Sequence, residues 1–453
     1  MAIDPEEQVA ELTLVQLISQ NQQLLLENER LKLQVIQLKN IIIQLKDKLN
    51  INSSNSGLPT SREVYRIEKK SKPKSDRSPG AQISHKYNSY QKKTPDINID
   101  VIPDEETCIC GNPLVLEEYT TYQKIEIPII KPVVTEYKLH EKRCSACNKK
   151  YKSGLDDYKL LGKNAESIIS ALSGFFNNSK REVQGILSQI FNLNISLGLI
   201  SNTERRISNT LESNYNKLVE LVKESSYVHL DETSAKNKGD KHWCWVATNK
   251  SSTVFKIANS RGKKVLESFL PEYEGNVISD RYAVYNMFDS SKRQICLAHL
   301  RRDFKRFAHS HNRCLGTIGS ELVHITDEIF RVYNLHKENK IDQSRYLTIM
   351  QKVKKIMLYY LKNVVDSEYL QAQKVANNIL KSFDMIWLFL HNSEIEITNN
   401  LAERQIKHFV KYRKNSFFTW SLRGDRFLER IKSFYATARL QNLDPFAQLL
   451  KMA

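Results

Sequence analysis

The sequence predicts a multidomain α/β protein that begins with a long helix and carries a mixed sheet flanked by helices in its second half. Three observations support this fold class. A leucine recurs at every seventh position near the N-terminus, and strand-like and helix-like segments alternate from residue 226 onward. The chain of 453 residues is also too long for one ordinary domain.

Charge is the strongest global signal of the sequence. The chain has 68 Lys and Arg against 51 Asp and Glu, a net charge of +17, which favours a nucleic acid as its partner. It contains no run of about 18 apolar residues, so we expect no membrane span. Seven cysteines without a secretion signal predict reduced thiols in a cytoplasm.

Residues 8–50 are predicted to form a leucine-zipper coiled coil. Five leucines occupy successive d positions: Leu17, Leu24, Leu31, Leu38 and Leu45. Asn21 and Asn28 fall at a positions, where polar residues fix the register of a parallel dimer. We expect a homodimer or a larger assembly through this helix. The alternative is an amphipathic helix packed on its own chain.

Residues 51–102 are predicted to form a basic flexible linker. Its stretch "KKSKPKSDRSPGAQISHKYNSYQKK" is rich in Ser, Pro and Lys and poor in core-forming residues. Such a segment could wrap phosphates or serve as a solvated spacer.

Residues 103–152 are predicted to form a zinc-binding module. Cys108 and Cys110 form one close pair, and Cys144 and Cys147 form another. The apolar alternation between the pairs suggests a hairpin, and two thiolate pairs at its ends could close a tetrahedral structural Zn²⁺ site. The alternative is a small β module with ordinary reduced cysteines.

Residues 153–225 are predicted to be a helical DNA-binding domain. The segment "REVQGILSQIFNLNISLGLISNTERRISNTL" suggests a helix, a short turn and a second helix that begins near Ser196 and carries Arg205 and Arg206. A helix-turn-helix reader of DNA would have this arrangement, although two helices that simply pack together would look the same.

From residue 226 the pattern changes to strands. The order is strand, strand, strand, helix, strand, helix, strand, helix, which is the order of a ribonuclease H-like fold. Residues 226–302 would form the first part of this catalytic core, residues 303–392 a helical segment, and residues 393–453 the second part of the core with its C-terminal helices.

Three acids stand at the expected places in that core. Asp231 follows the first strand and Asp280 the fourth, and Glu403 lies on a later helix. Carboxylates brought together at strand ends repel one another unless a cation lies between them. Mg²⁺ or Mn²⁺ suits such oxygen ligands, and two ions in one site support in-line displacement at a phosphodiester.

Each acid also has a purely structural interpretation. Asp231 could begin a turn, Asp280 could cap the next short helix, and Glu403 could close a capping box with Asn400. Glu232 is an alternative to Asp231, because neighbouring residues of a strand face opposite sides and the sequence does not say which faces the site.

The helix that carries Glu403 also carries a row of cations: Arg404, Lys407, Lys411 and Lys414. Their helical spacing places most of them along one face, where they could hold the phosphates of DNA. A solvated basic surface is the alternative.

Several stretches of the chain are similar to the transposases of the insertion-sequence-66 family. They are "HLDET", "HWCWVATN", "SDRYAVYN", "CLAHLRRDF", "TNNLAERQIK", "RKNSFF" and "ATARLQNLDPFAQLL", preceded by "NSSNSGLPTS", "SPGAQISH" and "CICGNPL…CSAC". The resemblance covers nearly the whole chain in the expected order.

This resemblance implies that Asp231, Asp280 and Glu403 form a DDE catalytic triad and that residues 303–392 are an insertion domain. Cys296 and His299 match a C-x-x-H signature of related DDE enzymes, which indicates either a zinc ligand or a packed strand end. The expected protein is a bacterial DNA transposase, associated with the nucleoid in the cytoplasm. It would bind terminal repeats and target DNA, cut, and join 3′ ends, with accessory transposition proteins as further partners. A ribonuclease H-like nuclease or resolvase, and an inactive DNA-binding protein, are the alternatives.

Overall fold

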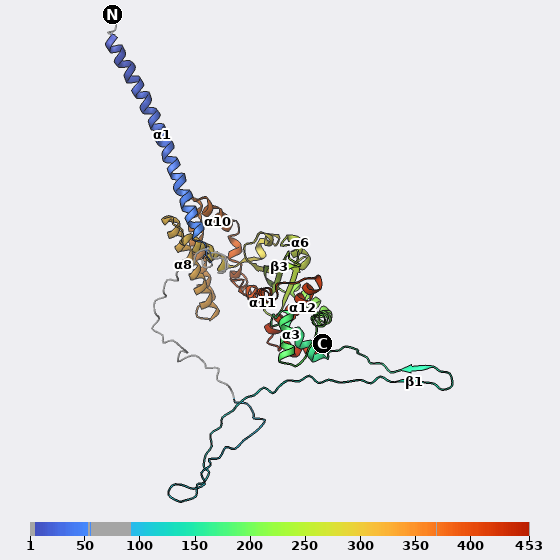
Figure 1. Cartoon of the computed structure of the whole chain (residues 1–453). Coiled ribbons are helices and arrows are strands. Elements are labelled where there is room, and N and C mark those ends of the chain that lie inside the picture. The colour runs from blue at the N-terminus through green and yellow to red at the C-terminus, as the bar shows by residue number, and fades with distance from the viewer. Residues whose placement is uncertain (1–4, 53–54, 56–91, 368, 453) are drawn as a thin grey trace. The chain divides into compact units, whose positions relative to one another are not determined.

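The computed structural model describes residues 5–52, 55, 92–367 and 369–452, with the side chains of residues 5–15 excepted (Figure 1). Most of the predicted linker, including "SPGAQISH", therefore lies outside the described residues. The chain divides into two compact units. One comprises Met1–Tyr65, Lys138–Gly185 and Ile195–Ala453, and the other comprises Arg66–Tyr137 and Ile186–Asn194.

The N-terminal segment is one continuous helix, α1 (Pro5–Leu49) (Figure 1). The five leucines of the heptad repeat are between 51% and 58% exposed within the single chain. A stripe of exposed leucines is what a coiled-coil partner would cover. The apolar face is exposed in the single chain, and the zipper stays a prediction. None of the helices among the described residues has both the length and the hydrophobicity that a bilayer span requires.

The predicted α/β class is confirmed by a five-stranded mixed sheet with the order β5-β4-β3-β6-β7. Its strands are β3 (Tyr227–Asn237), β4 (Asp240–Thr248), β5 (Thr253–Ala258), β6 (Asn276–Ser279) and β7 (Arg293–Ile295). The first three pair antiparallel, whereas β6 and β7 run parallel to β3. Helix α6 (Lys263–Phe269) connects β5 to β6, two 3₁₀ turns, η2 (Ala283–Met287) and η3 (Ser290–Lys292), connect β6 to β7, and α7 (Leu297–Ala308) follows.

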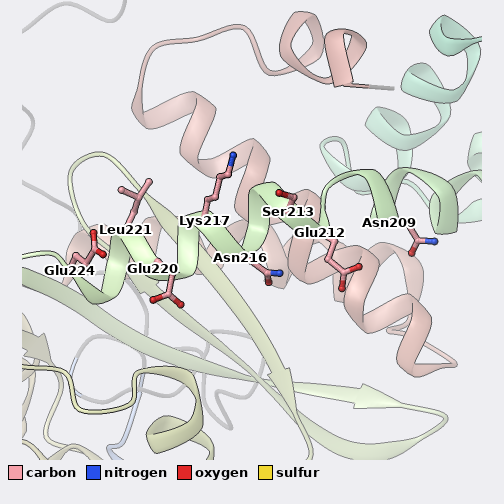
Figure 2. A pocket seen from close by; sticks show the side chains of 8 residues that line it. All are labelled: Asn209, Glu212, Ser213, Asn216, Lys217, Glu220, Leu221 and Glu224. Carbon is pink, nitrogen blue, oxygen red and sulfur yellow. The ribbon is translucent and has the colours of Figure 1, made fainter.

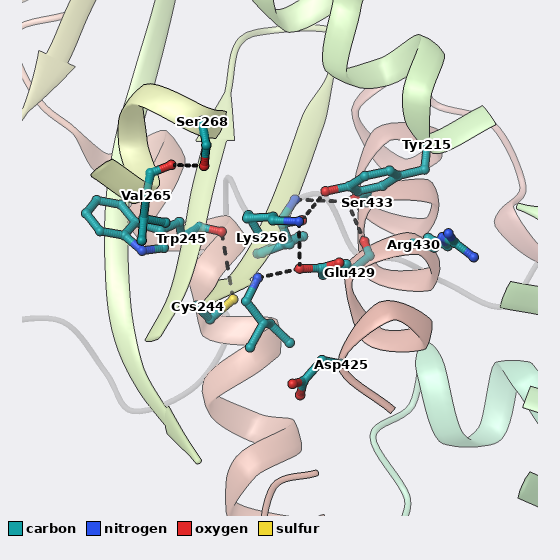
Figure 3. Close-up of polar contacts among 12 residues, drawn as sticks. Tyr215, Cys244, Trp245, Lys256, Val265, Ser268, Asp425, Glu429, Arg430 and Ser433 are labelled. Atoms are coloured by element: carbon teal, nitrogen blue, oxygen red, sulfur yellow. Dashed lines mark hydrogen bonds and ion pairs between the residues drawn. The ribbon is translucent and has the colours of Figure 1, made fainter. Parts of the chain in front are cut away.

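Strand β5 is an edge of the sheet, and helix α12 (Leu422–Leu440) covers it (Figure 3). Its outward N–H groups donate to polar side chains of α12. Phe255 donates to Ser433 Oγ at 2.9 Å and Ile257 to Glu429 Oε1 at 2.6 Å. Two strand residues span about 6.8 Å and one helical turn of four residues about 6 Å, so alternate N–H groups meet successive turns. The edge is therefore closed to other strands.

The helices around this half of the sheet share one apolar core with it. They are α2 (Lys163–Gly174), α4 (Leu197–Thr210), α11 (Asn400–Ser416), α12 and α13 (Pro445–Met452). Helix α3 (Lys180–Gln189) lies between α2 and α4 in the chain, and α5 (Glu212–Lys223) belongs to a separate core that it shares with α6 and the sheet. Gly174 permits the close contact of α2 with α12, because a Cβ there would lie 2.5 Å from Ile431 Cγ1. The predicted start of α4 near Ser196 is observed, and Ser196 Oγ accepts the N–H of Leu199.

The predicted helical segment 303–392 contains the end of α7, then α8 (Arg313–Lys337), α9 (Gln343–Val365) and α10 (Leu370–Lys381), followed by the short 3₁₀ turns η4 (Asp384–Ile386) and η5 (Leu388–Leu390). Its buried residues form one core with apolar residues of β6 and β7, among them Ile278 and Ile295. The insertion is therefore packed against the parallel half of the sheet.

The predicted hairpin between the two cysteine pairs is wrong. Residues 114–139 form no strand, and Pro128 and Pro132 remove two ladder donors from that stretch. Each cysteine pair instead lies in its own tight turn, and β1 (Glu141–Arg143) pairs with β2 (Lys150–Lys152) across the second turn. The N–H of Gly111 returns to Cys108 O at 2.8 Å in the first turn.

Candidate active site

Asp231 lies on β3, and Asp280 directly follows the adjacent parallel strand β6. His229 of β3 is paired with Ile278 of β6. Extending this register by two residues sets Asp231 beside Asp280, and neighbouring strands are about 4.8 Å apart. The predicted position of Asp231 at the end of its strand is wrong. Strand β3 continues to Asn237 because it forms a long hairpin with β4, so Asp231 lies mid-strand at the level where β6 ends.

Asp231 and Glu232 have different surroundings, which separates the two alternatives. Glu232 accepts hydrogen bonds from Arg261 and from the hydroxyl of Tyr285, and its side chain is only 2% exposed. Arg261 in turn stacks on Tyr282, with its guanidinium carbon 3.7 Å from the ring centre. Glu232 is thus paired with Arg261 inside the fold. Asp280 acts on both acids, and Glu403 contributes to the raised pKa of Asp231.

The loop that carries Asp280 is fixed from both sides. Asp280 Oδ1 accepts the N–H of Tyr282 at 2.9 Å, so the carboxylate does organise the following turn. Arg293, which is 1% exposed, donates to the carbonyl oxygen of Asp280 at 2.7 Å and to Ser279 Oγ at 3.2 Å. One oxygen of Asp280 therefore holds its own turn, which leaves the other as a potential ligand.

Glu403 lies in the first turn of α11, and the N-cap of that helix is Asn399 rather than Asn400. The predicted capping box is therefore not formed. Asn399 instead donates from Nδ2 to Leu230 O at 2.7 Å, and its N–H donates to Cys296 Sγ at 3.2 Å. One residue thus connects the segments that carry Asp231, the C-x-x-H signature and Glu403.

The sequence analysis did not identify Asn399 or its partner His229. His229 is fully buried, its Nδ1 lies 3.2 Å from Asn399 Oδ1, and burial lowers its pKa to about 4. Because Oδ1 can only accept, the neutral ring must donate from Nδ1. The signal in the sequence was an Asn immediately before the helix of the third acid, which suggests a cap and nothing more.

A second cluster surrounds Glu403. Among the residues that the structure describes, one group of three metal-ligating side chains has its ligand atoms within 4.8 Å of one another, and it consists of Cys296, His299 and Glu403. His299 Nδ1 lies 3.7 Å from Glu403 Oε1, and both atoms are buried without a hydrogen-bond partner. Cys296 is buried and its thiol accepts the backbone N–H of Asn399, while its sulfur also lies within reach of His299 and Glu403, so both interpretations stay predictions. Neither aspartate belongs to this group.

The electrostatics of the site favour a bound cation. Burial raises the pKa of Asp231 to about 8, with further contributions from the negative charges of Glu232, Asp280 and Glu403. Burial lowers the pKa of His299, and Arg302 lowers it further. A buried carboxylate with a raised pKa beside other acids is stabilised by a divalent cation, and hard oxygen ligands suit Mg²⁺ or Mn²⁺. The residues present therefore fit the ions that the sequence implies.

The residues predicted to contact DNA fall into two groups. Arg205, Arg404, Lys407, Lys411 and Lys414 are exposed. Arg206 is instead held inside its domain, where Nε donates to Glu166 Oε1 at 2.6 Å. Its guanidinium connects α4 to α2. The positive charge that was predicted to contact DNA is therefore already paired with Glu166.

The two cysteine turns resemble each other although their spacings differ. In each, the residue after the second cysteine has positive φ: 87° at Gly111 and 60° at Asn148. The pKa of Cys110 is lowered by the backbone N–H of Asn112 and by Cys108, and the pKa of Cys144 by backbone N–H groups of residues 147 and 146. Thiolate character is what zinc requires of its ligands.

A surface hollow of about 790 Å³ lies away from the three acids, along α5 (Figure 2). Glu212, Glu220 and Glu224 line it together with Lys217. An acidic lining repels phosphates, and the hollow contains none of the residues predicted for the site. It is therefore a poor candidate for binding DNA.

Residues 181–426, just over half of the chain, match the protein family described as Transposase IS66 family. The chain therefore belongs to the IS66 family of transposases. Two curated relatives come from Sinorhizobium fredii. Uncharacterized protein y4jD is 24% identical over 57% of this chain and 56% of its own length. Uncharacterized protein y4qI is 23% identical over 50% of this chain and 47% of its own length. The chain thus spans about half the length of these relatives.

Proposed function

We propose that the chain is a DNA transposase of a bacterial insertion sequence, with Asp231, Asp280 and Glu403 as its catalytic carboxylates. The observation that carries this proposal is the parallel pairing of β3 and β6, whose register brings Asp231 to the level of Asp280 directly after β6, combined with the electrostatic coupling of Asp231 to Glu403. Membership of the IS66 transposase family supports the same assignment. The strand order β5-β4-β3-β6-β7 supports a ribonuclease H-like core.

The three carboxylates would hold two Mg²⁺ or Mn²⁺ ions, Asp231 and Asp280 on one and Glu403 on the other. Such ions supply an activated attacking oxygen and stabilise the leaving oxygen of a phosphodiester. The protein's own contribution is to fix these ligands. Arg293 holds the turn of Asp280, and Asn399 holds the first turn of the Glu403 helix against β3. Hydrolysis at the ends of the element would leave 3′ hydroxyls, and attack by these hydroxyls on target DNA would join the strands.

The other parts of the chain have proposed roles in the same reaction. The exposed leucines of α1 would pair two protomers, so that two ends of the element are held together. Arg205 and the cations of α11 would contact the DNA backbone. Each cysteine turn offers two cysteine sulfurs, the ligand type of structural zinc, and Zn²⁺ remains the proposed structural cofactor. Accessory transposition proteins remain proposed partners.

The test is a strand-transfer assay on duplexes that carry pre-cleaved 3′ ends of the element, with Mg²⁺ or Mn²⁺ added. The wild-type chain should join these ends to target DNA. Asp231→Asn, Asp280→Asn and Glu403→Gln should each lower the rate by at least about a hundredfold. Glu267→Gln, on the exposed face of α6, is the matched control and should leave the rate unchanged.

Each alternative function predicts a different result in this assay. Hydrolysis of DNA without joining would identify a nuclease or resolvase. Binding of DNA with neither cleavage nor joining would identify an inactive DNA-binding protein. Joining that persists in the Asp231→Asn variant would show that the triad is wrongly assigned.

A further inference from the structure

The loop that follows the Glu403 helix exposes several large apolar side chains. Phe417 is 78% exposed, Trp420 72% and Leu422 69%. By contrast, Trp245 and Trp387, two of the four tryptophans, are each only 1% exposed. Several large apolar side chains exposed within one short loop cost free energy in water, so they indicate a contact with a partner.

This loop is firmly attached to the tip of the β3–β4 hairpin. The N–H of Lys238 donates to Thr419 O at 3.0 Å, and the N–H of Thr419 lies 3.4 Å from Lys236 O. Asn237 Nδ2 donates to Asp425 Oδ2 at 2.5 Å, and the Thr419 hydroxyl donates to the same carboxylate. Thr419 is only 7% exposed. The aromatic side chains on either side of it are therefore presented from a rigid base, which lowers the entropy cost of binding.

The backbone conformation of the loop is unfavourable for the residues that it carries. Phe417 has φ 53° and Phe418 has φ 74°, both in the left-handed region. Phe417 ends α11 in the position where glycine or asparagine is usual. Bulky side chains rarely occupy this region, and such strain concentrates at functional sites. An aromatic ring at residue 417 therefore has a use beyond ending the helix.

The surroundings of the loop are strongly basic. No Asp or Glu occurs between residues 404 and 424. The exposed cations of this stretch are Arg404, Lys407, Lys411, Lys414 and Arg423, and the hairpin tip adds Lys236, Lys238 and Lys241. A surface that combines cations with exposed aromatic rings suits a nucleic acid, whose phosphates bind the cations and whose bases stack on the rings.

The loop lies at a definite distance from the proposed catalytic site. From Glu403 to Phe417 the helix rises about 21 Å. From Asp231 to Asn237 the strand extends about 20 Å. Both elements run from the site to this loop, and α11 packs along β3 and β4. Because base pairs are spaced about 3.4 Å apart, a duplex that runs along the basic face of α11 would meet the loop about six base pairs from the bond at the triad.

We propose that Phe417 and Trp420 stack against bases at a distorted step of a DNA duplex, about six base pairs from the scissile phosphate. This inference rests on the proposed function, because the triad defines where the duplex begins. The duplex is either the end of the element or the target. Both present the same chemistry, an exposed π face flanked by phosphates.

The test measures binding of the full-length chain to duplexes with 2-aminopurine five to seven base pairs from the terminus. The Asp231→Asn variant, with Ca²⁺ present, prevents cleavage during the measurement. Binding should increase the fluorescence of the probe, because its base becomes unstacked. Trp420→Ala should abolish this increase and weaken binding about tenfold, whereas Trp420→Phe should keep most of both. Tyr359→Ala, an aromatic residue of α9 that is 62% exposed, should change neither.

Two further variants separate stacking from charge and from folding. Lys411→Ala should reduce the salt dependence of binding by about one counterion, whereas Trp420→Ala should leave that slope unchanged. Phe417→Gly should raise the thermal unfolding midpoint, because glycine relieves the positive φ, and yet weaken DNA binding. A residue with only a structural role would move stability and binding in the same direction.

The outcomes distinguish the element's end from target DNA, and the stacking contact from the proposed transposase function. An increase in fluorescence with the element's end alone assigns the contact to that end, and an increase with an unrelated duplex assigns it to target DNA. The stacking contact would be overturned if the wild-type chain bound DNA tightly, Trp420→Ala bound it equally well, and neither duplex changed its fluorescence. The transposase assignment would stand in that case. Failure of the wild-type chain to bind any DNA would instead count against the proposed function itself.

Discussion

Replacing Asp231 by asparagine should stabilise the folded chain in the absence of divalent cations while it abolishes catalysis. The side chain lies beside Asp280 and is coupled to Glu403, and burial raises its pKa from 3.8 to about 8. The folded state therefore holds a proton that the unfolded state has already lost. Stability is fully present below about pH 4, the unfolded pKa, and is lost as the pH rises towards 8. Asparagine has nearly the same shape and no charge, so it removes this loss.

The size of the effect follows from the pKa of Asp231. A difference of about four units, at 1.36 kcal/mol each, sets an upper limit of about 5–6 kcal/mol at pH 8. Solvent reaches this half-buried carboxylate, so we expect about 2 kcal/mol. In a domain of this size that free energy raises the unfolding midpoint by about 4–8 °C. At pH 4 the difference between variant and wild type should be close to zero.

Thermal unfolding between pH 4 and pH 8, in buffer without added divalent cations, measures this effect. Asp327→Asn is the matched control of opposite sign. Arg301 donates to both oxygens of Asp327, at 2.5 and 2.8 Å, and this contact lowers the pKa of the carboxyl. Its stabilisation is present above the unfolded pKa and is lost as the pH falls, so Asp327→Asn should be the less stable protein at pH 8 and equal to wild type at low pH.

Added Mg²⁺ should raise the midpoint of the wild-type chain at pH 8 more than that of Asp231→Asn, because a bound cation offsets the same repulsion. The reasoning would be refuted if Asp231→Asn were less stable than wild type at pH 8 without cations. In that case protein hydrogen bonds would already satisfy the carboxylate, and Asp231 would be a structural residue.

Three further predictions concern the framework around the site. Ser433→Ala should lower the free energy of unfolding in urea by about 1–3 kcal/mol, because it leaves the buried N–H of Phe255 without an acceptor; no change would show that the edge of the sheet does not need α12. Leu31→Lys should convert an assembled species to monomers in analytical ultracentrifugation, and an unchanged mass would exclude the zipper as the contact. Asn399→Ala should lower the rate of strand transfer and raise the Mg²⁺ concentration that it requires without weakening DNA binding, whereas an equal loss in binding would indicate general misfolding.

The sequence predicted the order of strands and the acids beside them because both depend on local patterns. It did not predict that β3 runs six residues past Asp231, because that length is set by pairing with β4 across the sheet. It assigned Arg206 to DNA because the partner of that side chain, Glu166, lies forty residues earlier. The alternative interpretation of Glu403, a capping box with Asn400, is not formed, since the N-cap is Asn399 and its side chain makes tertiary contacts instead. Each of these errors concerns a partner that is distant in the chain.

The same distant partners explain how Glu403 is positioned although a long helical insertion separates it from the two aspartates. Helix α11 is fixed to β3 at both ends. Asn399 donates to Leu230 O before the helix begins, and Arg413 donates to Ser234 O at 2.9 Å near its end. Both acceptors lie on the strand that carries Asp231. The distance between Asp231 and Glu403 is therefore set by β3 and α11 themselves, so that α8, α9 and α10 can contact other molecules or change conformation without displacing the third carboxylate.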